Sequence, residues 1–204
     1  SPGAGKTALL EATIRQMGEG LRIAVIEGDL ETENDAERIR KLGVKAIQIA
    51  TGSACHLDAH MIHDALHNLD LAEYDIVFIE NVGNLVCPAS FDLGQHVNVA
   101  LLSVPEGDDK PAKYPVMFRT ADLVMISKCD LLPILDDFDP ERAKQYLQDI
   151  ASTAPVIALS SKNLAGMNNW IEWVTQQVEE RIAYLEAHPL PSAHHHHHHD
   201  HDHH

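Results

Sequence analysis

The stretch SPGAGKTALLEATIRQM, residues 1–17, decides the fold class. It contains Gly5, Lys6 and Thr7, the end of the phosphate-loop pattern G-x-x-x-x-G-K-S/T, and a run typical of a helix follows. The first glycine of the pattern would fall one position before Ser1, and the strand that normally precedes the loop is also absent from the sequence. We therefore expect the chain to be part of a longer protein. The alternative is a glycine-rich segment in front of an ordinary helix.

The residue types in this loop suit the binding of phosphate groups. Backbone N–H groups of Gly3, Ala4 and Gly5 would curl around the phosphates, and the start of the helix adds a favourable dipole. Lys6 would reach the β- and γ-phosphates and act in catalysis, and Thr7 would bind Mg²⁺. The loop therefore predicts a nucleotide site built from these five residues.

Short apolar runs alternate with helical patterns along the rest of the chain. The runs predict strands, and segments of helical periodicity lie between them. Strands separated by helices imply a mostly parallel sheet with helices on both faces, the α/β arrangement of a P-loop NTPase fold. We expect strands over 21–28, 45–50, 74–83, 96–104, 121–128 and 154–159, and helices over 34–43, 56–71, 139–152 and 168–188.

Two acidic residues follow predicted strands. Asp29 ends the run IEGD, and Glu80 lies in the run FIENVG. Ligands of parallel α/β sheets bind beyond the carboxyl ends of the strands, so both carboxylates are expected near the phosphates. Either could hold Mg²⁺ directly or through water. Each alone could equally be a solvated loop acid, but together with Lys6 and Thr7 they favour a catalytic magnesium site that includes Asp29.

Two further segments indicate that the base is guanine. SKCD (127–130) follows a predicted strand, at the place where a GTPase carries the guanine-reading motif N-K-x-D. The Asp130 carboxylate can accept hydrogen bonds from guanine N1 and N2, which adenine does not offer in that arrangement. Ser127 stands in place of the usual Asn, so the match is partial. The run SSKN resembles the S-A-K loop that contacts the guanine oxygen. The predicted base contacts are Lys128, Asp130, Ser160, Ser161 and Lys162.

The stretch CHLDAHMIHDALH (55–67) suggests metal binding. Cys55 and His56 begin it, and Cys87 follows a predicted strand end, so the two segments could meet at one edge of the sheet. A thiolate and an imidazole are good ligands for Ni²⁺ or Zn²⁺. Three ligands leave a position open, and two-fold symmetry could bring together ligands from two subunits. The alternative is that both cysteines are small hydrophobic residues without a shared role.

The other histidines of this stretch are weaker candidates. His56, His60, His63 and His67 lie on one face of the predicted helix. His60, four residues after His56, is the best placed of the remaining three to support or replace a ligand. We expect His63 and His67 to be solvated.

Composition restricts the class of partner and compartment. The net charge of the 204-residue chain is −16, which argues against DNA or RNA as the main partner. No apolar run reaches the roughly 18 residues that span a bilayer, so we expect no membrane association. The three cysteines do not resemble a disulfide framework, which indicates reduced thiols and a cytoplasmic protein.

Residues 189–204 form a separate segment after the predicted domain of residues 1–188. Nine of the last eleven residues are histidine. Six of them are consecutive, as in an expression tag, but the appended DHDHH is not needed in one. A native metal-holding tract is the equal alternative.

The chain resembles the HypB family, the GTPases that incorporate nickel during hydrogenase maturation. The resemblance covers nearly all of residues 1–188 and rests on SPGAGKT, IEGD, DAERI, TGSACHLDAHMI, IENVGNLVCP, SVPEGDDKPAKYPVMF, SKCDLLP and SSKNLAGMNNWIEW. It implies a metal-related GTPase of the SIMIBI type, which hydrolyses GTP to GDP and phosphate. It also implies a homodimer on GTP binding, with a nickel or zinc site of Cys55, His56 and Cys87 at the subunit interface. The implied partners are a hydrogenase large-subunit precursor and other maturation proteins.

Two other functions remain open. A urease-type accessory GTPase is expected to carry a Cys-Pro-His metal motif, whereas here Cys87 and Pro88 are followed by Ala89. A nickel storage protein without enzymatic activity would instead use the histidines of residues 194–204.

Overall fold

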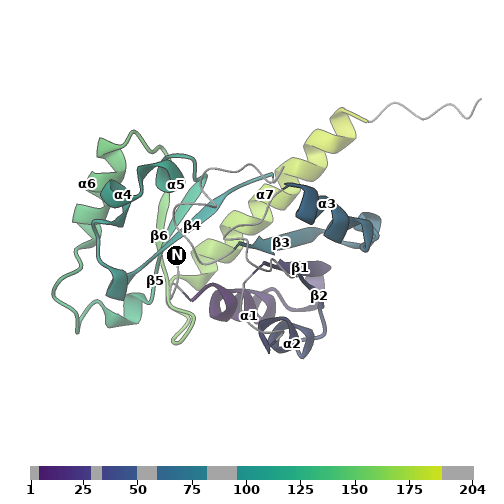
Figure 1. Ribbon diagram of the computed structural model, residues 1–204, viewed down its shortest axis with the longest axis horizontal. Coiled ribbons are helices and arrows are strands. Elements are labelled where there is room, and N and C mark those ends of the chain that lie inside the picture. Colours follow the sequence, from purple (N-terminus) through teal and green to yellow (C-terminus); the bar gives the residue numbers. More distant parts are fainter. Residues whose placement is uncertain (1–4, 29–33, 50–58, 82–95, 190–204) are drawn as a thin grey trace, which may run out of the picture.

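The strands of the described residues form two parallel sheets of three strands each. The structure is a computed structural model that describes residues 5–28, 34–49, 59–81 and 96–189. In the first sheet β1 (Ile23–Glu27) lies between β2 (Lys45–Gln48) and β3 (Ile76–Glu80). In the second sheet β5 (Leu123–Ser127) lies between β4 (Val99–Ser103) and β6 (Val156–Ala158). Figure 1 shows the two groups of strands, with α2 beside the first sheet and α6 beside the second.

Seven α-helices connect and cover these strands within the described residues. Short 3-10 turns lie at Gly18–Gly20, Leu71–Glu73, Val104–Glu106 and Cys129–Leu131. No helix of the described chain is both long enough and apolar enough to cross a bilayer. The α-helices are α1 (Lys6–Met17), α2 (Asn34–Arg40), α3 (Ala59–His67), α4 (Lys110–Lys113), α5 (Pro115–Arg119), α6 (Pro140–Asp149) and α7 (Met167–Ala187).

Helices cover both faces of the first sheet. All five residues of β1 are buried, and successive side chains of a strand point to opposite faces. Val25 packs in one apolar cluster with Leu10 of α1 and Ile39 of α2. Ile26 packs in another cluster with Ile62 of α3. The β-branched run of 21–28 is therefore buried on both faces, as the expected parallel sheet requires.

The second sheet is covered in the same way. Met125 of β5 packs with Trp170 of α7 and Leu9 of α1. On the opposite face, Ile126 packs with Phe118 of α5 and with residues of α6. Because Leu10 of α1 packs against the first sheet and Leu9 against the second, α1 packs against both.

Two expectations about the fold need adjustment. The strands were expected in one sheet, but in the described residues hydrogen bonds join them into two, with no pairing between β3 and β4. The short helices α4 and α5 were not among the predicted elements. Pro111 and Pro115 lie in their first turns, where no backbone donor is needed.

The expected helix ends are largely confirmed. Asp139 caps α6 by accepting a hydrogen bond from the Glu141 N–H at 2.9 Å, and Pro140 is its first residue. α2 ends at Arg40, and the turn closes where Gly43, at a φ of 84°, donates from its N–H to the Arg40 carbonyl. The four helices and six strands foreseen in the sequence are present, each shorter at one end or both.

Candidate functional site

The start of α1 is set by a glycine in a left-handed conformation. Gly5 precedes Lys6 with φ 82° and ψ 35°, a region that residues with a side chain adopt only with strain. The Gly5 carbonyl accepts the N–H of Leu9 at 2.9 Å, which closes the first turn of the helix. The glycine of the G-K-S/T pattern is therefore required by its backbone angles.

Thr7 and Glu80 come together between α1 and the end of β3. The Thr7 hydroxyl lies 3.0 Å from Oε1 and 3.1 Å from Oε2 of Glu80, to which it donates. The two residues are only 8% and 6% exposed. A hydroxyl and a carboxylate are oxygen ligands of the kind that Mg²⁺ prefers, so this pair fits the predicted magnesium site in chemistry and in position.

The Lys6 side chain points to the same strand end. Its ammonium group donates a 2.8 Å hydrogen bond to the backbone carbonyl of Asn81, the residue after Glu80. A positive charge at the start of α1 is therefore held against the backbone just after the end of β3. This is the position from which a lysine can neutralise phosphate oxygens bound at a helix start.

Glu27 is an acidic residue of this region that the sequence reasoning missed. It is the last residue of β1, it is fully buried, and it pairs in register with Glu80 of β3. The N–H of Gly28 donates to the Glu80 carbonyl at 2.9 Å, so the two strand ends are tied together. The run IEGD contains both acids, Glu27 before the glycine and Asp29 after it, and only Asp29 was predicted.

The loops after β5 and β6 are joined through Ser160. The Ser160 hydroxyl donates a 2.8 Å hydrogen bond to the Asp130 carboxylate. The same oxygen accepts the N–H groups of Lys162 and Asn163, both at 3.2 Å. Ser160 is fully buried. Two segments 30 residues apart in sequence therefore form one structure around the predicted guanine-reading acid.

We call residues 127–130 and 160–163 the base loop. Lys128 brings this base loop close to the phosphate loop. Its backbone is left-handed, with φ 59°. A methyl group placed on Gly5 would lie 3.7 Å from the Lys128 Cε, so the lysine stem runs past the start of α1. The predicted base contacts and phosphate contacts thus lie next to each other. Ser161 and Lys162 follow Ser160 in the loop, half-buried and exposed respectively.

Two neighbours in the base loop have distinct environments. Ser127, which stands where Asn is usual, is buried at the end of β5 and lies in register with Ser103 of β4. Burial raises the pKa of the Cys129 thiol above its ordinary value, and the negative charge of Asp130 raises it further. Cys129 is therefore a thiol with little thiolate character at neutral pH.

Several predicted site residues lie outside the described residues. Within the described ranges, no group of three or more His, Cys, Asp or Glu side chains is arranged to hold a metal ion. The residues outside those ranges are Gly3, Ala4, Asp29, Cys55, His56 and Cys87, together with the histidines of residues 194–204.

The three other histidines of the predicted metal stretch lie on α3. All three are exposed, which agrees with the expectation that His63 and His67 are solvated. His60 lies 3.5 Å from the Asp64 carboxylate. His63 and His67 contact each other, with their Nε2 atoms 2.9 Å apart. The contact between these two rings was not foreseen.

Comparison with known protein families matches residues 1–158 to the nucleotide-binding domain of CobW, HypB and UreG. The chain is 53% identical over 182 residues to the hydrogenase maturation factor HypB of Azotobacter vinelandii, covering 89% of this chain and 60% of that protein. It is 51% identical over 177 residues to HypB of Escherichia coli, covering 87% of this chain and 61% of that protein. The chain thus spans about three fifths of the length of these relatives.

Two solved HypB structures have the same fold as this chain. The crystal structure of HypB from Helicobacter pylori in complex with nickel has a TM-score of 0.82 and 44% identity, covering 89% of this chain and 85% of that one. HypB from Archaeoglobus fulgidus has a TM-score of 0.79 and 41% identity, covering 86% and 85%. The phosphate loop, the base loop and this similarity agree: the chain belongs to the CobW/HypB/UreG family of P-loop proteins and, within it, to the HypB hydrogenase maturation factors.

Proposed function

We propose that this chain is the GTP-hydrolysing domain of a nickel metallochaperone. It would hydrolyse GTP to GDP and phosphate, bind nickel, and promote nickel insertion into a hydrogenase large-subunit precursor in the cytoplasm. The relatives are hydrogenase maturation factors by name, and the Helicobacter pylori neighbour was crystallised with nickel. Both support the proposal for this chain.

The proposal that the nucleotide is GTP and not ATP is supported by the closeness of the base loop and the phosphate loop. Asp130 is held by the Ser160 hydroxyl, and the Lys128 stem passes Gly5 at the start of α1. A fixed carboxylate can accept from N1 and N2 of guanine, which gives selectivity because adenine would leave it without donors. The approach of Lys128 to Gly5 would place the bound base close to the phosphate loop.

The residues at the strand ends have separate tasks in hydrolysis. Lys6 would leave the Asn81 carbonyl and neutralise the β- and γ-phosphate oxygens. Thr7 and Glu80 would hold Mg²⁺, Glu80 directly or through water. Bound Mg²⁺ supplies positive charge where the leaving GDP oxygen becomes negative. Asp29 would orient the attacking water, whose oxygen bonds to the γ-phosphorus as the bond to the β–γ bridging oxygen breaks.

Turnover by the domain alone is expected to be slow. Within the described residues, Arg22, Arg38 and Arg142 form ion pairs with acids outside the phosphate loop, and an arginine finger is what accelerates many P-loop GTPases. A dimer formed on GTP binding would change the surroundings of the γ-phosphate, and we propose such a homodimer here.

The nickel ligands are proposed to be Cys55, His56 and Cys87. Glu80 and Cys87 are seven residues apart in sequence, so a shift on binding the γ-phosphate could reach the thiolate. If GTP favours a dimer that alters the nickel site, each ligand must change the affinity for the other. Zinc suits the same ligands and could occupy the site when nickel is scarce.

Hydrolysis is tested first in the full-length protein. GTP should be hydrolysed in preference to ATP, and Lys6→Ala should abolish turnover while Ni²⁺ still binds. Lys144→Ala is the matched control, because Lys144 is an exposed lysine of α6 that pairs with Glu141. Equal use of ATP and GTP, or unchanged turnover in Lys6→Ala, would contradict the proposed nucleotide site.

Coupling is tested by measuring Ni²⁺ affinity with GDP and with a non-hydrolysable GTP analogue. The histidines of residues 194–204 are replaced by serine so that they do not compete. Cys55→Ser and Cys87→Ser should each remove the high-affinity equivalent. The same affinity and stoichiometry in both nucleotide states, with the dimer present in one of them, would reject coupling.

A second client is suggested by one relative. The Helicobacter pylori protein, 45% identical over 184 residues, is a hydrogenase/urease maturation factor by name. Nickel transfer in parallel to a hydrogenase precursor and to an apo-urease would tell which client this protein serves. Storage without catalysis predicts instead that Ni²⁺ binding is lost with the tail histidines and that nucleotide has no effect.

A further inference from the structure

The outer face of α3 carries a pair of imidazoles that neither the nucleotide site nor the Cys55, His56 and Cys87 site uses. We propose that His63 and His67 form a second, bidentate site for a divalent transition-metal ion, of a geometry suited to Ni²⁺ or Cu²⁺. The inference does not depend on the proposed function, since it rests on α3 alone.

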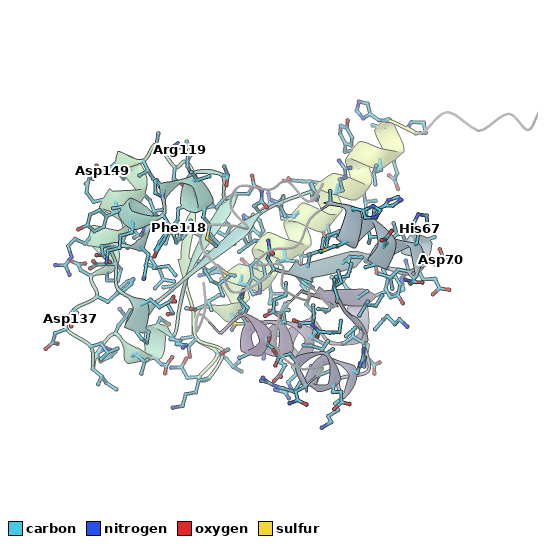
Figure 2. All side chains as sticks on the ribbon, in the orientation of Figure 1. His67, Asp70, Phe118, Arg119, Asp137 and Asp149 are labelled. Carbon is cyan, nitrogen blue, oxygen red and sulfur yellow. The ribbon has the colours of Figure 1, made fainter. Side chains whose placement is uncertain are left out.

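The helix holds this pair toward solvent. Ile62 and Ala65 bury one side of α3 in an apolar cluster with Ala24 and Ile26 of β1. His63 and His67 are one helical turn apart on the opposite side, and both are exposed. Figure 2 shows His67 on the side of α3 away from the strands. A helix fixed by its buried side presents both side chains from fixed backbone positions one turn apart.

The two rings already meet through their Nε2 atoms. Those atoms are 2.9 Å apart, and the rings lie edge to face with centroids 4.4 Å apart. A neutral pair at this distance needs one ring with its proton on Nε2 and the other with its proton on Nδ1. One Nε2 lone pair therefore already points into the space between the rings.

Metal binding requires only a small change in the protonation of this pair. The donor ring moves its proton from Nε2 to Nδ1, so both Nε2 atoms offer lone pairs and no net proton is released. Two histidines four residues apart on one helix face are a known way of binding a transition metal. Water would fill the remaining positions, since the pair is open to solvent.

The nitrogen separation favours one coordination geometry. With metal–nitrogen bonds of about 2.05 Å, two nitrogens at a right angle lie about 2.9 Å apart, whereas a tetrahedral angle needs about 3.3 Å. A right angle belongs to square-planar or octahedral sites, which Ni²⁺ and Cu²⁺ adopt, and tetrahedral angles are typical of zinc. The two Nε2 atoms are 2.9 Å apart in their hydrogen bond, so they need to change their separation little to bind a metal ion at a right angle.

An exposed carboxylate between the two histidines in sequence strengthens the attraction for a cation. Asp64 lies between the two histidines in sequence and is exposed, with its carboxylate 3.5 Å from the His60 ring. Its negative charge on the same helix face lowers the cost of bringing in a divalent ion. The pair thus forms an open site on the helix that follows Cys55 and His56 in sequence, where an incoming ion could be captured.

The test uses the full chain with the other metal ligands removed. Cys55 and Cys87 are changed to serine, His56 is changed to glutamine, and the histidines of residues 194–204 are changed to serine. Binding of NiCl₂ is then measured by isothermal titration calorimetry in the parent, in His67→Gln and in His63→Gln. His188→Gln is the matched control, because His188 is an exposed histidine at a helix end whose Nδ1 lies 3.0 Å from the Tyr184 carbonyl.

We expect one equivalent of Ni²⁺ in the parent and in His188→Gln, and its loss in both α3 variants. A second variant restores the spacing: Ala59→His in the His67→Gln background places a histidine four residues before His63, and the equivalent should return. Circular dichroism checks that each variant keeps its helix content. Binding that is equal in all variants, or absent from the folded parent, overturns the site.

Spectroscopy gives an independent readout. In histidine-labelled protein, added Zn²⁺ should move the ring signals of His63 and His67 together and leave His188 unchanged. Signals of the two rings that respond separately, or not at all, would contradict shared coordination.

Discussion

The Ser160 hydroxyl holds the Asp130 carboxylate at 2.8 Å, and both ends of this contact lie in loops that follow neighbouring strands. Ser160 also accepts the N–H groups of Lys162 and Asn163, so one buried oxygen organises two loops. The acid that is proposed to read guanine is thereby fixed before the base arrives, and a pre-positioned acceptor loses less entropy on binding.

Replacing Ser160 should therefore weaken GTP binding without unfolding the protein. Ser160→Ala removes the hydrogen bond to Asp130 and leaves two backbone N–H groups without their acceptor. We expect GTP affinity to fall roughly tenfold, the equivalent of about 1.4 kcal/mol. Ser152→Ala is the control, since Ser152 also accepts a backbone N–H but lies before β6. Fluorescent GTP titrations measure both, and equal affinities would show that Asp130 needs no such support.

The buried pair of Thr7 and Glu80 predicts how hydrolysis depends on magnesium. Glu80→Gln keeps an oxygen for the Thr7 hydroxyl but removes the negative charge. The Mg²⁺ concentration for half-maximal turnover should rise at least about tenfold, because a carboxylate is the stronger ligand for a hard cation. Glu141→Gln, at an exposed glutamate of α6, should leave this Mg²⁺ concentration unchanged. An unaltered magnesium dependence in Glu80→Gln would remove Glu80 from the site.

A buried hydrogen bond between α1 and α7 predicts a stability effect. Trp170 Nε1 donates to the Thr13 hydroxyl at 2.8 Å, and that hydroxyl donates to the Leu9 carbonyl at 2.6 Å. Thr13→Val leaves the buried indole N–H without an acceptor, so the free energy of unfolding should fall by about 1–3 kcal/mol. Urea denaturation followed by tryptophan fluorescence measures the change.

Thr120→Val is the matched control for that experiment. Thr120 also donates to a carbonyl one turn earlier, that of Val116 at 3.0 Å, but it is exposed and supports no other side chain. Its replacement should alter the free energy of unfolding by about 0.5 kcal/mol or less. Equal losses in Thr13→Val and Thr120→Val would show that the bond to Trp170 contributes nothing.

The environment of Cys129 predicts slow alkylation. Burial and the charge of Asp130 both raise the pKa of the thiol, so less thiolate is present at a given pH, and the thiolate is the reactive form. Iodoacetamide at pH 8 should modify Cys129 more slowly than a cysteine in a short peptide. Asp130→Asn should speed the reaction by lowering the pKa, whereas Asp149→Asn, on α6, should not. Peptide mass spectrometry resolves the three cysteines, and a rate independent of Asp130 would refute the effect.

Local sequence patterns predicted the elements and the phosphate loop because their signals are local. Gly5, Lys6 and Thr7 are consecutive, and the β-branched residues of β1 show burial on two faces within one short run. The pairing of Thr7 with Glu80 could be anticipated only as nearness, since parallel strands place their carboxyl ends at one edge. The hydrogen bond itself is a property of the folded chain.

The features that were missed depend on tertiary packing. Whether a hydroxyl reaches a carboxylate 30 residues away, as Ser160 reaches Asp130, depends on how two loops pack. The ring contact of His63 and His67 depends on side-chain rotamers that spacing alone leaves open. The pairing of the described strands into two sheets and the burial of Glu27 at the end of β1 are likewise seen only in the folded chain.

The most direct test of the account is a change of nucleotide selectivity at Asp130. In Asp130→Asn the side-chain amide can donate to the O2 of xanthine but no longer accepts both guanine donors. The affinity of the full-length protein for GTP should fall about 10- to 100-fold, as expected for losing hydrogen bonds to a charged group, and its affinity for xanthosine triphosphate should rise. Asp149→Asn should do neither. Unchanged GTP affinity in Asp130→Asn, with no gain for xanthosine triphosphate, would contradict guanine recognition by this loop.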